Sequence, residues 1–305
     1  MRSQVLTLPL AGPAGEPVDL WRTLMSHGVA DLPPGRVDEE ARTYETTLAL
    51  PGVRPRTVRV AEGRAGEAAV EVRGPPLAET RRAPLLAAVR RVLNLDEDLS
   101  AFYAVAAADP ELSWATRGAG RMVRSPTVFE DVVKTICTTN CAWSATQRMV
   151  GALVDHLGEE SAGRHGRAFP SAAAMAEAPE DFYRDVARAG YRGAYLRSLA
   201  TDVAGGGLDL EELREAPQEE LPDEEVERRL LALPGVGPYA AAHVMMLLGR
   251  HARLILDSWT RPKYARLNGG VAATDAELLA RFRPYGRYAG LAFWLYLTRD
   301  WVADG

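Results

Sequence analysis

A glycine-rich turn followed by an acid is the part of the chain whose residue types and spacing best suit chemistry. The turn reads LPGVG at residues 233–237, an apolar helical run begins near Tyr239, and Asp257 follows the apolar triplet 254–256. Two glycines allow backbone amides to approach an anion closely, and the following helix adds the positive end of its dipole. A single carboxylate beside a phosphate-gripping turn indicates chemistry on a nucleic acid.

Simpler roles are open for the same residues. Asp257 stands before Ser258, Trp259 and Thr260, a position that suits a helix N-cap. A cap would also hold the carboxylate in place, so this interpretation is compatible with a chemical role. The glycines of the turn are also typical of ordinary turns between packed helices.

The turn and the acid at this spacing resemble the helix-hairpin-helix motif and trailing catalytic aspartate of the base-excision DNA glycosylases, the HhH-GPD superfamily that includes endonuclease III. The resemblance implies that Gly235, Val236 and Gly237 bind a DNA phosphate through their backbone, with Na+ or K+ as a candidate ion at 233–237. It also implies that Asp257 is catalytic. A carboxylate there stabilises positive charge on the sugar and orients or deprotonates water, once the nucleotide has been flipped into a pocket.

The residue two positions after the turn distinguishes subtypes within this superfamily. Bifunctional members carry a lysine there, which attacks the sugar and then nicks the strand. This chain has Tyr239, which cannot form a Schiff base, and residues 238–249 contain no lysine. The resemblance therefore implies a monofunctional DNA N-glycosylase, a hydrolase of N-glycosyl bonds without AP-lyase activity. Tyr239 itself is predicted to form a wall of the base pocket, with plain helix packing as the alternative.

Two further segments resemble the parts of 8-oxoguanine DNA glycosylases that fill the gap left by a flipped base. Residues 136–140 end in Asn140, which by resemblance enters the vacated stack, and Gly190 precedes Tyr191 and Arg192. Tyr191 would wedge the duplex and Arg192 would contact the orphaned base, roles that suit an aromatic ring and a bidentate guanidinium. The alternatives are a helix C-cap for Asn140 and a surface turn for the other two.

Residues 285–297 resemble the family helix that lines the base pocket. The 8-oxoguanine enzymes place a glutamine and a phenylalanine on it, where this chain has Phe293 and Leu297, and the motif that presents a glycine carbonyl is disturbed at residues 26–28. Aromatic residues suit stacking on a cationic alkylated purine, with core packing as the alternative. Alkylated purines are therefore the favoured substrates, ahead of 8-oxoguanine and other oxidised or deaminated bases. The predicted base pocket comprises Tyr239, His243, Trp259, Phe293 and Trp294.

The composition is that of an ordinary globular protein, with 305 residues, 47% of them hydrophobic and 25% charged. Apolar runs are too short to span a bilayer or to form a signal peptide, so a cytoplasmic protein without a membrane partner is expected. With the DNA-repair function that the resemblance implies, the protein is expected to be a nucleoid-associated monomer. The net charge of −5 argues mildly against binding double-stranded DNA, although arginines cluster locally. Cys137 and Cys141 do not complete a zinc or iron–sulfur site, so no cofactor and no metal held by side chains are predicted.

An α+β fold is expected, with an N-terminal antiparallel β domain followed by an all-helical HhH-GPD glycosylase body. Alternating residues predict strands at 43–50, 57–61 and 68–73 within a domain of residues 1–83. The helical domain, residues 84–305, is divided into a subdomain at 126–250 that carries the hairpin and another formed by 84–125 with 251–305. This order resembles the branch of 8-oxoguanine DNA glycosylase and 3-methyladenine DNA glycosylase II. Predicted helices are 84–94, 126–141, 143–157, 182–189, 195–203, 224–232, 239–248, 275–283 and 288–301.

One function of a different class remains open: a lesion-recognising DNA-binding protein that uses a glycosylase scaffold without catalysis. The acidic net charge and the replaced guanine readers favour it. The presence of Asp257 at the family spacing argues against it.

Overall fold

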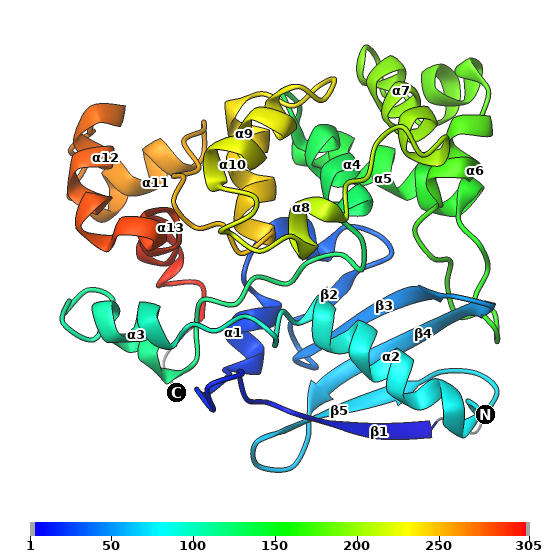
Figure 1. The fold of residues 1–305 in the computed structure, drawn as a ribbon, viewed down its shortest axis with the longest axis horizontal. Coiled ribbons are helices and arrows are strands. Elements are labelled where there is room, and N and C mark those ends of the chain that lie inside the picture. The colour runs from blue at the N-terminus through cyan, green and yellow to red at the C-terminus, as the bar shows by residue number, and fades with distance from the viewer. Residues whose placement is uncertain (1–3, 303–305) are drawn as a thin grey trace.

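The computed structural model describes residues 4–302 as an antiparallel β-sheet on one side of the molecule and a helical body on the other (Figure 1). The predicted fold class is confirmed. The five strands are ordered β1-β5-β4-β3-β2. Their bounds are β1 Gln4–Pro9, β2 Arg36–Asp38, β3 Thr43–Leu50, β4 Val53–Glu62 and β5 Glu67–Val72.

Strand β4, at Val53–Glu62, is longer than the strand predicted at 57–61 from alternating residues. The observed strand begins at Val53 and contains Pro55, a residue that lacks the N–H that a ladder needs. In the structure the β3–β4 ladder is irregular between Leu48 and Leu50, opposite this proline, and regular again from Leu48 and Arg56 onward. Strand β1 pairs with β5, far away in the sequence, and was not predicted.

The first long helix, α2 (Glu79–Val92), lies along the sheet (Figure 1). Its buried residues Leu85, Val89 and Val92 belong to the same hydrophobic cluster as the sheet residues Val58 and Val60. On packing grounds we propose that the β domain extends through α2 to about residue 95, beyond the boundary at residue 83 expected from the sequence.

The remaining helices form the body, and most predicted ones are present. The segment predicted as a helix at 182–189 is a π-helix at Phe182–Val186 instead, whose longer i→i+5 hydrogen bonds include the one from Ala187 N to Phe182 O. No helix within residues 4–302 is long and apolar enough to cross a membrane. The α-helices are α1 Leu20–Leu24, α3 Ser100–Ala106, α4 Val128–Thr138, α5 Trp143–Leu157, α6 Ala172–Glu177, α7 Arg192–Ala204, α8 Glu212–Glu215, α9 Asp223–Leu231, α10 Pro238–Leu247, α11 Thr260–Leu267, α12 Asp275–Phe282 and α13 Ala289–Thr298.

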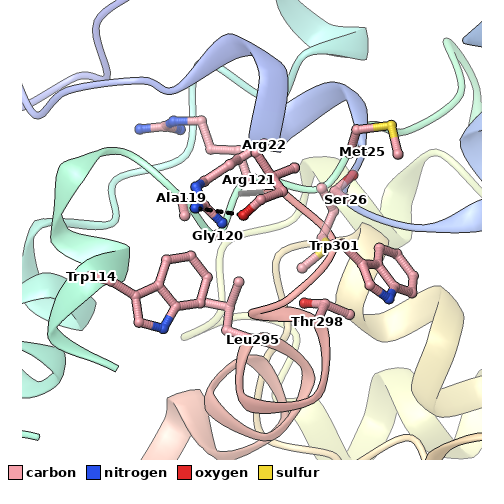
Figure 2. Close-up of a pocket in the computed structure, with 12 residues that line it drawn as sticks. Arg22, Met25, Ser26, Trp114, Ala119, Gly120, Arg121, Leu295, Thr298 and Trp301 are labelled. Carbon is pink, nitrogen blue, oxygen red and sulfur yellow. Dashed lines mark hydrogen bonds between the residues drawn. The ribbon is translucent and has the colours of Figure 1, made fainter. Parts of the chain in front are cut away.

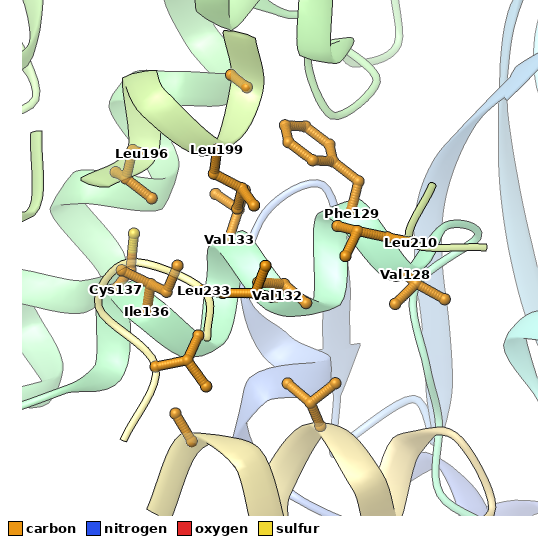
Figure 3. Packing of buried hydrophobic residues seen from close by; sticks show 14 of the residues in the cluster. Val128, Phe129, Val132, Val133, Ile136, Cys137, Leu196, Leu199, Leu210 and Leu233 are labelled. Atoms are coloured by element: carbon orange, nitrogen blue, oxygen red, sulfur yellow. The ribbon is translucent and has the colours of Figure 1, made fainter. Parts of the chain in front are cut away.

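Helix α10 lies between the two hydrophobic cores of the helical body, and all of its residues from 240 to 247 are buried. Its Val244 packs in the core built on α4, α5, α7 and α9, where Val133 and Ile136 of α4 lie near Leu196 and Leu199 of α7 (Figure 3). Its Met246 packs in the other core, around α13. Because both cores contact α10, the start of this helix is held at a fixed place in the molecule.

A small cavity of about 20 Å³ lies where the N-terminal segment meets α13. Trp114 and Trp301 stand on either side of Leu295 and Thr298 (Figure 2). A space of this size accommodates about one water molecule, so it is a packing feature and not a ligand site.

A buried ion pair connects several loops at the wall of this cavity. The guanidinium of Arg121, which is fully buried, lies 2.6 Å from the Glu16 carboxylate and donates to the carbonyls of Asn94 and Glu97 at 2.7 and 2.6 Å. Glu16 also accepts from the backbone N–H of Leu99 at 3.2 Å. Two charges removed from water require each other, so the loss of either one leaves an uncompensated buried charge.

We therefore predict that Glu16→Gln lowers the free energy of unfolding by about 3 kcal/mol, because Arg121 keeps its charge without its counterion. Urea denaturation at neutral pH measures this change. The control is Asp185→Asn, which removes an exposed ion pair with Arg184 and is expected to leave the midpoint unchanged. Equal midpoints for Glu16→Gln and the wild type would contradict the assignment.

Two buried histidines, His243 of α10 and His27, pack edge to face. The ring centroids of His27 and His243 are 5.5 Å apart, and Nε2 of His27 donates to the Val123 carbonyl. Nδ1 of His27 and Nε2 of His243 are buried and have no hydrogen-bond partner among residues 4–302. Burial lowers the pKa of His27 to about 4 and that of His243 to about 3, so both rings are neutral near pH 7.

These depressed pKa values predict that stability falls in acid. A histidine with a pKa near 6.5 when unfolded and lower when folded contributes stability that is fully present above pH 6.5 and is lost as the pH falls. Relative to a His243→Gln variant, the wild type should lose about 1.4 kcal/mol of unfolding free energy per pH unit between about pH 6.5 and 4.

Urea titrations of both proteins at several pH values test this. Asp131, whose pKa burial raises to about 7, gives the opposite trend in both proteins and cancels in the difference. Parallel pH curves for the wild type and the variant would refute the prediction.

Candidate active site

A cavity of about 580 Å³ opens where the end of α4, the α9–α10 hairpin and the segment before α11 meet. It brings together residues that lie far apart in the sequence and that were singled out separately. Of the predicted site residues it is lined by Asn140, Tyr191, Gly235, Gly237, Tyr239 and Asp257. The other lining residues are Thr138, Thr139, Cys141, Pro238, Ala240, Leu256 and Ser258.

The carboxylate of Asp257 is held by the helix that it precedes. Its Oδ1 accepts from the backbone N–H groups of Trp259 and Thr260 at 2.8 and 2.7 Å, and its own N–H donates to Thr260 Oγ1 at 2.9 Å. Within the described residues, no hydrogen bond is made to Oδ2. The carboxylate therefore fills a capping role at the start of α11 with one oxygen and keeps the other available to the cavity.

The first turn of α10 places Tyr239 beside this acid. The phenol oxygen lies 3.2 Å from Thr138 Oγ1 at the end of α4. Burial raises the pKa of Tyr239, and the charge of Asp257 adds to the rise. The phenol is therefore neutral and cannot act as an anionic nucleophile near pH 7.

The hairpin between α9 and α10 has the geometry of a tight backbone turn. Gly235 has φ +83°, and a Cβ there would lie 2.8 Å from the Tyr195 ring, so a glycine is required. Val236 is buried in the core and anchors the loop, while Gly237 caps α10 with open space around its Cα and Pro238 follows as the first helical residue. The turn thus places Gly235, Gly237 and the positive end of α10 at the cavity, while the Val236 N–H donates to the Leu233 carbonyl within the turn.

Asn140 and Tyr191 lie together at the rim of the cavity. Asn140 follows α4 in a left-handed conformation with φ +46°, and its Nδ2 is 3.5 Å from the Tyr191 hydroxyl. The Tyr191 side chain is 54% exposed and its ring packs edge to face on Tyr195 at 5.8 Å. A large aromatic ring is thereby held in solvent beside the cavity, on a rigid support.

Arg192 is placed differently from its neighbour. Arg192 is only 6% exposed. Its guanidinium donates to the Thr139 carbonyl and, through Nε at 3.3 Å, to Thr139 Oγ1. The guanidinium also stacks on the Tyr191 ring at 4.6 Å. In this structure the arginine braces the end of α4, and it would have to leave these partners to contact a base.

Four of the residues expected to line the base pocket lie behind its wall. Phe293 is fully buried against Phe282, with ring centroids 5.1 Å apart, and His243 packs on His27. Trp259 packs on Trp294, whose Nε1 donates to the Ser26 carbonyl at 2.8 Å. These side chains pack in the hydrophobic core behind the cavity, in line with the alternative of core packing given for the aromatic residues.

Sequence reasoning missed Thr138, Thr139, Leu256 and Ser258 as lining residues. The signal was present, because the two threonines directly precede Asn140 and the other two directly flank Asp257. Small polar residues next to a singled-out residue at a helix end share its surroundings.

The two cysteines lie at the C-terminal end of α4 and pack there. Burial raises the pKa of Cys137 to about 12, and the Cys141 thiol lies 3.2 Å from the Cys137 carbonyl. Among the described residues there is no group of three or more histidine, cysteine, aspartate or glutamate side chains that could hold a metal.

No protein-family model matches the chain. A DNA-3-methyladenine glycosylase from Bacillus subtilis (strain 168) is 25% identical over 177 residues, which cover 56% of each chain, so the match spans little more than half the length of that curated relative. A solved 3-methyladenine DNA glycosylase from Archaeoglobus fulgidus superposes with a TM-score of 0.73 and 20% identity, over 98% of this chain and 100% of that one. An 8-oxoguanine glycosylase/lyase from Clostridium acetobutylicum, solved with double-stranded DNA containing cytosine opposite 8-oxoguanine, gives a TM-score of 0.69 and 20% identity, over 93% and 92%. The chain has the fold of the helix-hairpin-helix DNA glycosylases.

Proposed function

We propose that the protein is a monofunctional DNA glycosylase of base excision repair that hydrolyses the N-glycosidic bond of a flipped, damaged base. The observation that carries this proposal is the cavity in which the carboxylate of Asp257, with its Oδ2 left open, lies beside the glycine-rich hairpin and an exposed aromatic ring. The partner is double-stranded DNA that contains a damaged base, bound by a monomer.

Asp257 would act on the sugar. As the bond to the base breaks, its electron pair leaves with the base and positive charge develops on the sugar, where a fixed carboxylate is stabilising. Water then bonds to the sugar carbon and releases a proton, for which Asp257 Oδ2 is the acceptor. The cap on Oδ1 fixes the carboxylate before the substrate arrives, so no reorganisation is needed during the reaction.

The proposal includes no lyase step, since an imine with the sugar requires a free amine. The sequence contains two lysines, Lys134 and Lys263. Lys134 is buried 2.8 Å from Glu130, Lys263 pairs with the exposed Asp300, and neither lines the cavity. The product is therefore an intact abasic site.

An alkylated purine is the favoured substrate. The cavity wall carries a carboxylate, a neutral phenol and threonine hydroxyls, which suit a cationic base, and such a base leaves as a neutral molecule without prior protonation. The B. subtilis relative and the A. fulgidus neighbour are both 3-methyladenine glycosylases by name, which supports the same substrate class. An oxidised or deaminated base is the second candidate, supported by the 8-oxoguanine enzyme among the structural neighbours.

Asp257→Asn should abolish excision and preserve binding. We expect the single-turnover rate to fall by at least about 10²-fold, because the amide keeps the shape but carries no charge. Duplexes with 7-methylguanine, a 3-methyladenine surrogate, hypoxanthine, 8-oxoguanine or uracil are incubated with excess protein and analysed with and without alkali. Strand breaks are expected only after alkali.

The matched control is Asp275→Asn, which removes an exposed carboxylate paired with Arg261 outside the cavity. Full activity of Asp257→Asn would exclude its catalytic role, and breaks without alkali would exclude the monofunctional mechanism. Binding without excision across the panel would identify a non-catalytic lesion-binding protein.

Tyr191→Ala should weaken binding to a duplex with an abasic-site analogue by roughly tenfold, because a stacked aromatic ring contributes about 1–3 kcal/mol. Tyr191→Phe keeps the ring and loses the contact of the hydroxyl with Asn140, so near-normal affinity is expected. Fluorescence anisotropy at fixed salt measures both. Equal affinities for the alanine variant and the wild type would rule out the wedge.

A further inference from the structure

Thr138 is the last residue of α4 and forms part of the cavity wall. Its hydroxyl lies 2.7 Å from the Thr135 carbonyl and 3.2 Å from the Tyr239 hydroxyl. A threonine hydroxyl has one proton to donate and two lone pairs to accept with. The direction of the contact with Tyr239 therefore depends on where the Thr138 proton goes.

The hydrogen bonds at the C-terminal end of α4 determine which group accepts the Thr138 proton. The backbone N–H of Thr139 donates to the Ile136 carbonyl, three residues back, and so leaves the Thr135 carbonyl without its usual helical donor. A carbonyl can only accept, so the contact at 2.7 Å takes the Thr138 proton. Tyr239 must then donate its own proton to Thr138 Oγ1, and the lone pairs of its phenol oxygen remain for the cavity.

A second hydroxyl on this wall follows the same pattern. The Thr139 hydroxyl donates to the Ile136 carbonyl at 2.8 Å and accepts from Arg192 Nε at 3.3 Å. The carbonyls at the end of the helix therefore take the protons of both threonines. The hydroxyl oxygens of Thr138 and Thr139, the Tyr239 phenol oxygen and the Asp257 carboxylate are hydrogen-bond acceptors of this wall.

We propose that Thr138 is a positioning residue that holds Tyr239 as a hydrogen-bond acceptor toward the cavity, so that Tyr239 and Asp257 together receive the two protons of the attacking water. This inference rests on the proposed glycosylase function. With both protons held, a lone pair of the water oxygen is directed at the sugar. The oxygen bonds to the sugar carbon, the electron pair of the glycosidic bond leaves with the base, and the proton passes to Asp257.

The test begins with Thr138→Val, which keeps the side-chain shape and removes the acceptor, so that Tyr239 is free to turn its proton into the cavity. We expect the single-turnover rate on the best substrate of the lesion panel to fall about tenfold, with affinity for an abasic-site duplex unchanged, as displaced reacting groups cost rate more than binding. Thr138→Ser restores the hydroxyl and should recover most of the rate. The control is Thr135→Val on the same helix, whose hydroxyl donates to the Asp131 carbonyl and does not line the cavity.

A double-mutant cycle separates positioning from a merely structural role. If Thr138 acts through the Tyr239 hydroxyl, Thr138→Val should have no further effect in a Tyr239→Phe background. The inference is overturned if Thr138→Val retains the wild-type rate, if it slows Tyr239→Phe as much as it slows the wild type, or if serine fails to restore the rate in a protein of normal unfolding midpoint. A wild type that excises no base, like Asp257→Asn, would instead refute the proposed function itself.

Discussion

The burial of α10 on every side is the constraint on which the rest of the structure depends. Successive residues of this helix face different cores, since Val244 packs with α4 and α7 whereas Met246 packs with α13. A helix held in this way cannot shift along its axis without disturbing both cores, because close-packed interiors resist small displacements. Its N-terminus therefore fixes the hairpin glycine Gly237 and, two residues later, Tyr239. The cavity lies where this anchored end reaches the surface.

Three helix ends meet at the cavity, and the side chains that complete them are the side chains that line it. Thr138 supplies the hydroxyl that the C-terminal carbonyls of α4 need, and Asp257 accepts from the first N–H groups of α11. Gly237 leaves the start of α10 open toward the cavity. Helix ends carry unsatisfied backbone groups and a partial charge, so they need polar residues that are also rigidly held. Capping and chemistry thus make the same demand on these positions, so the observed capping contacts of Asp257 are compatible with its proposed catalytic role.

The sequence was informative where a property is local. Alternation over residues 43–50 and helical periodicity over 143–157 predicted β3 and α5 with their observed bounds, and turn chemistry located the hairpin. Pro262 obscured α11, although proline is tolerated in a first helical turn. Strand β1 depends on a distant partner, β5, which no local pattern reveals. Helix α13 is buried on all sides, so its sequence indicated no preferred face and could not tell whether Phe293 and Trp294 face the cavity or the core.

The position of those aromatic residues bears on how the proposed enzyme would select its substrate. With Phe293 and Trp294 behind the wall, the rings at the cavity belong to Tyr239 and Tyr191, and the one charged side chain among the lining residues is Asp257. A carboxylate beside the base distinguishes a cation from a neutral base by charge, and it makes few contacts with the hydrogen-bonding edge of the base. Selection would then follow the charge of the base and the weakness of its glycosidic bond, two properties that alkylation changes together. A fixed carboxylate and a water held by two acceptors would suffice for such a bond, without the nucleophilic lysine that the chain lacks at this site.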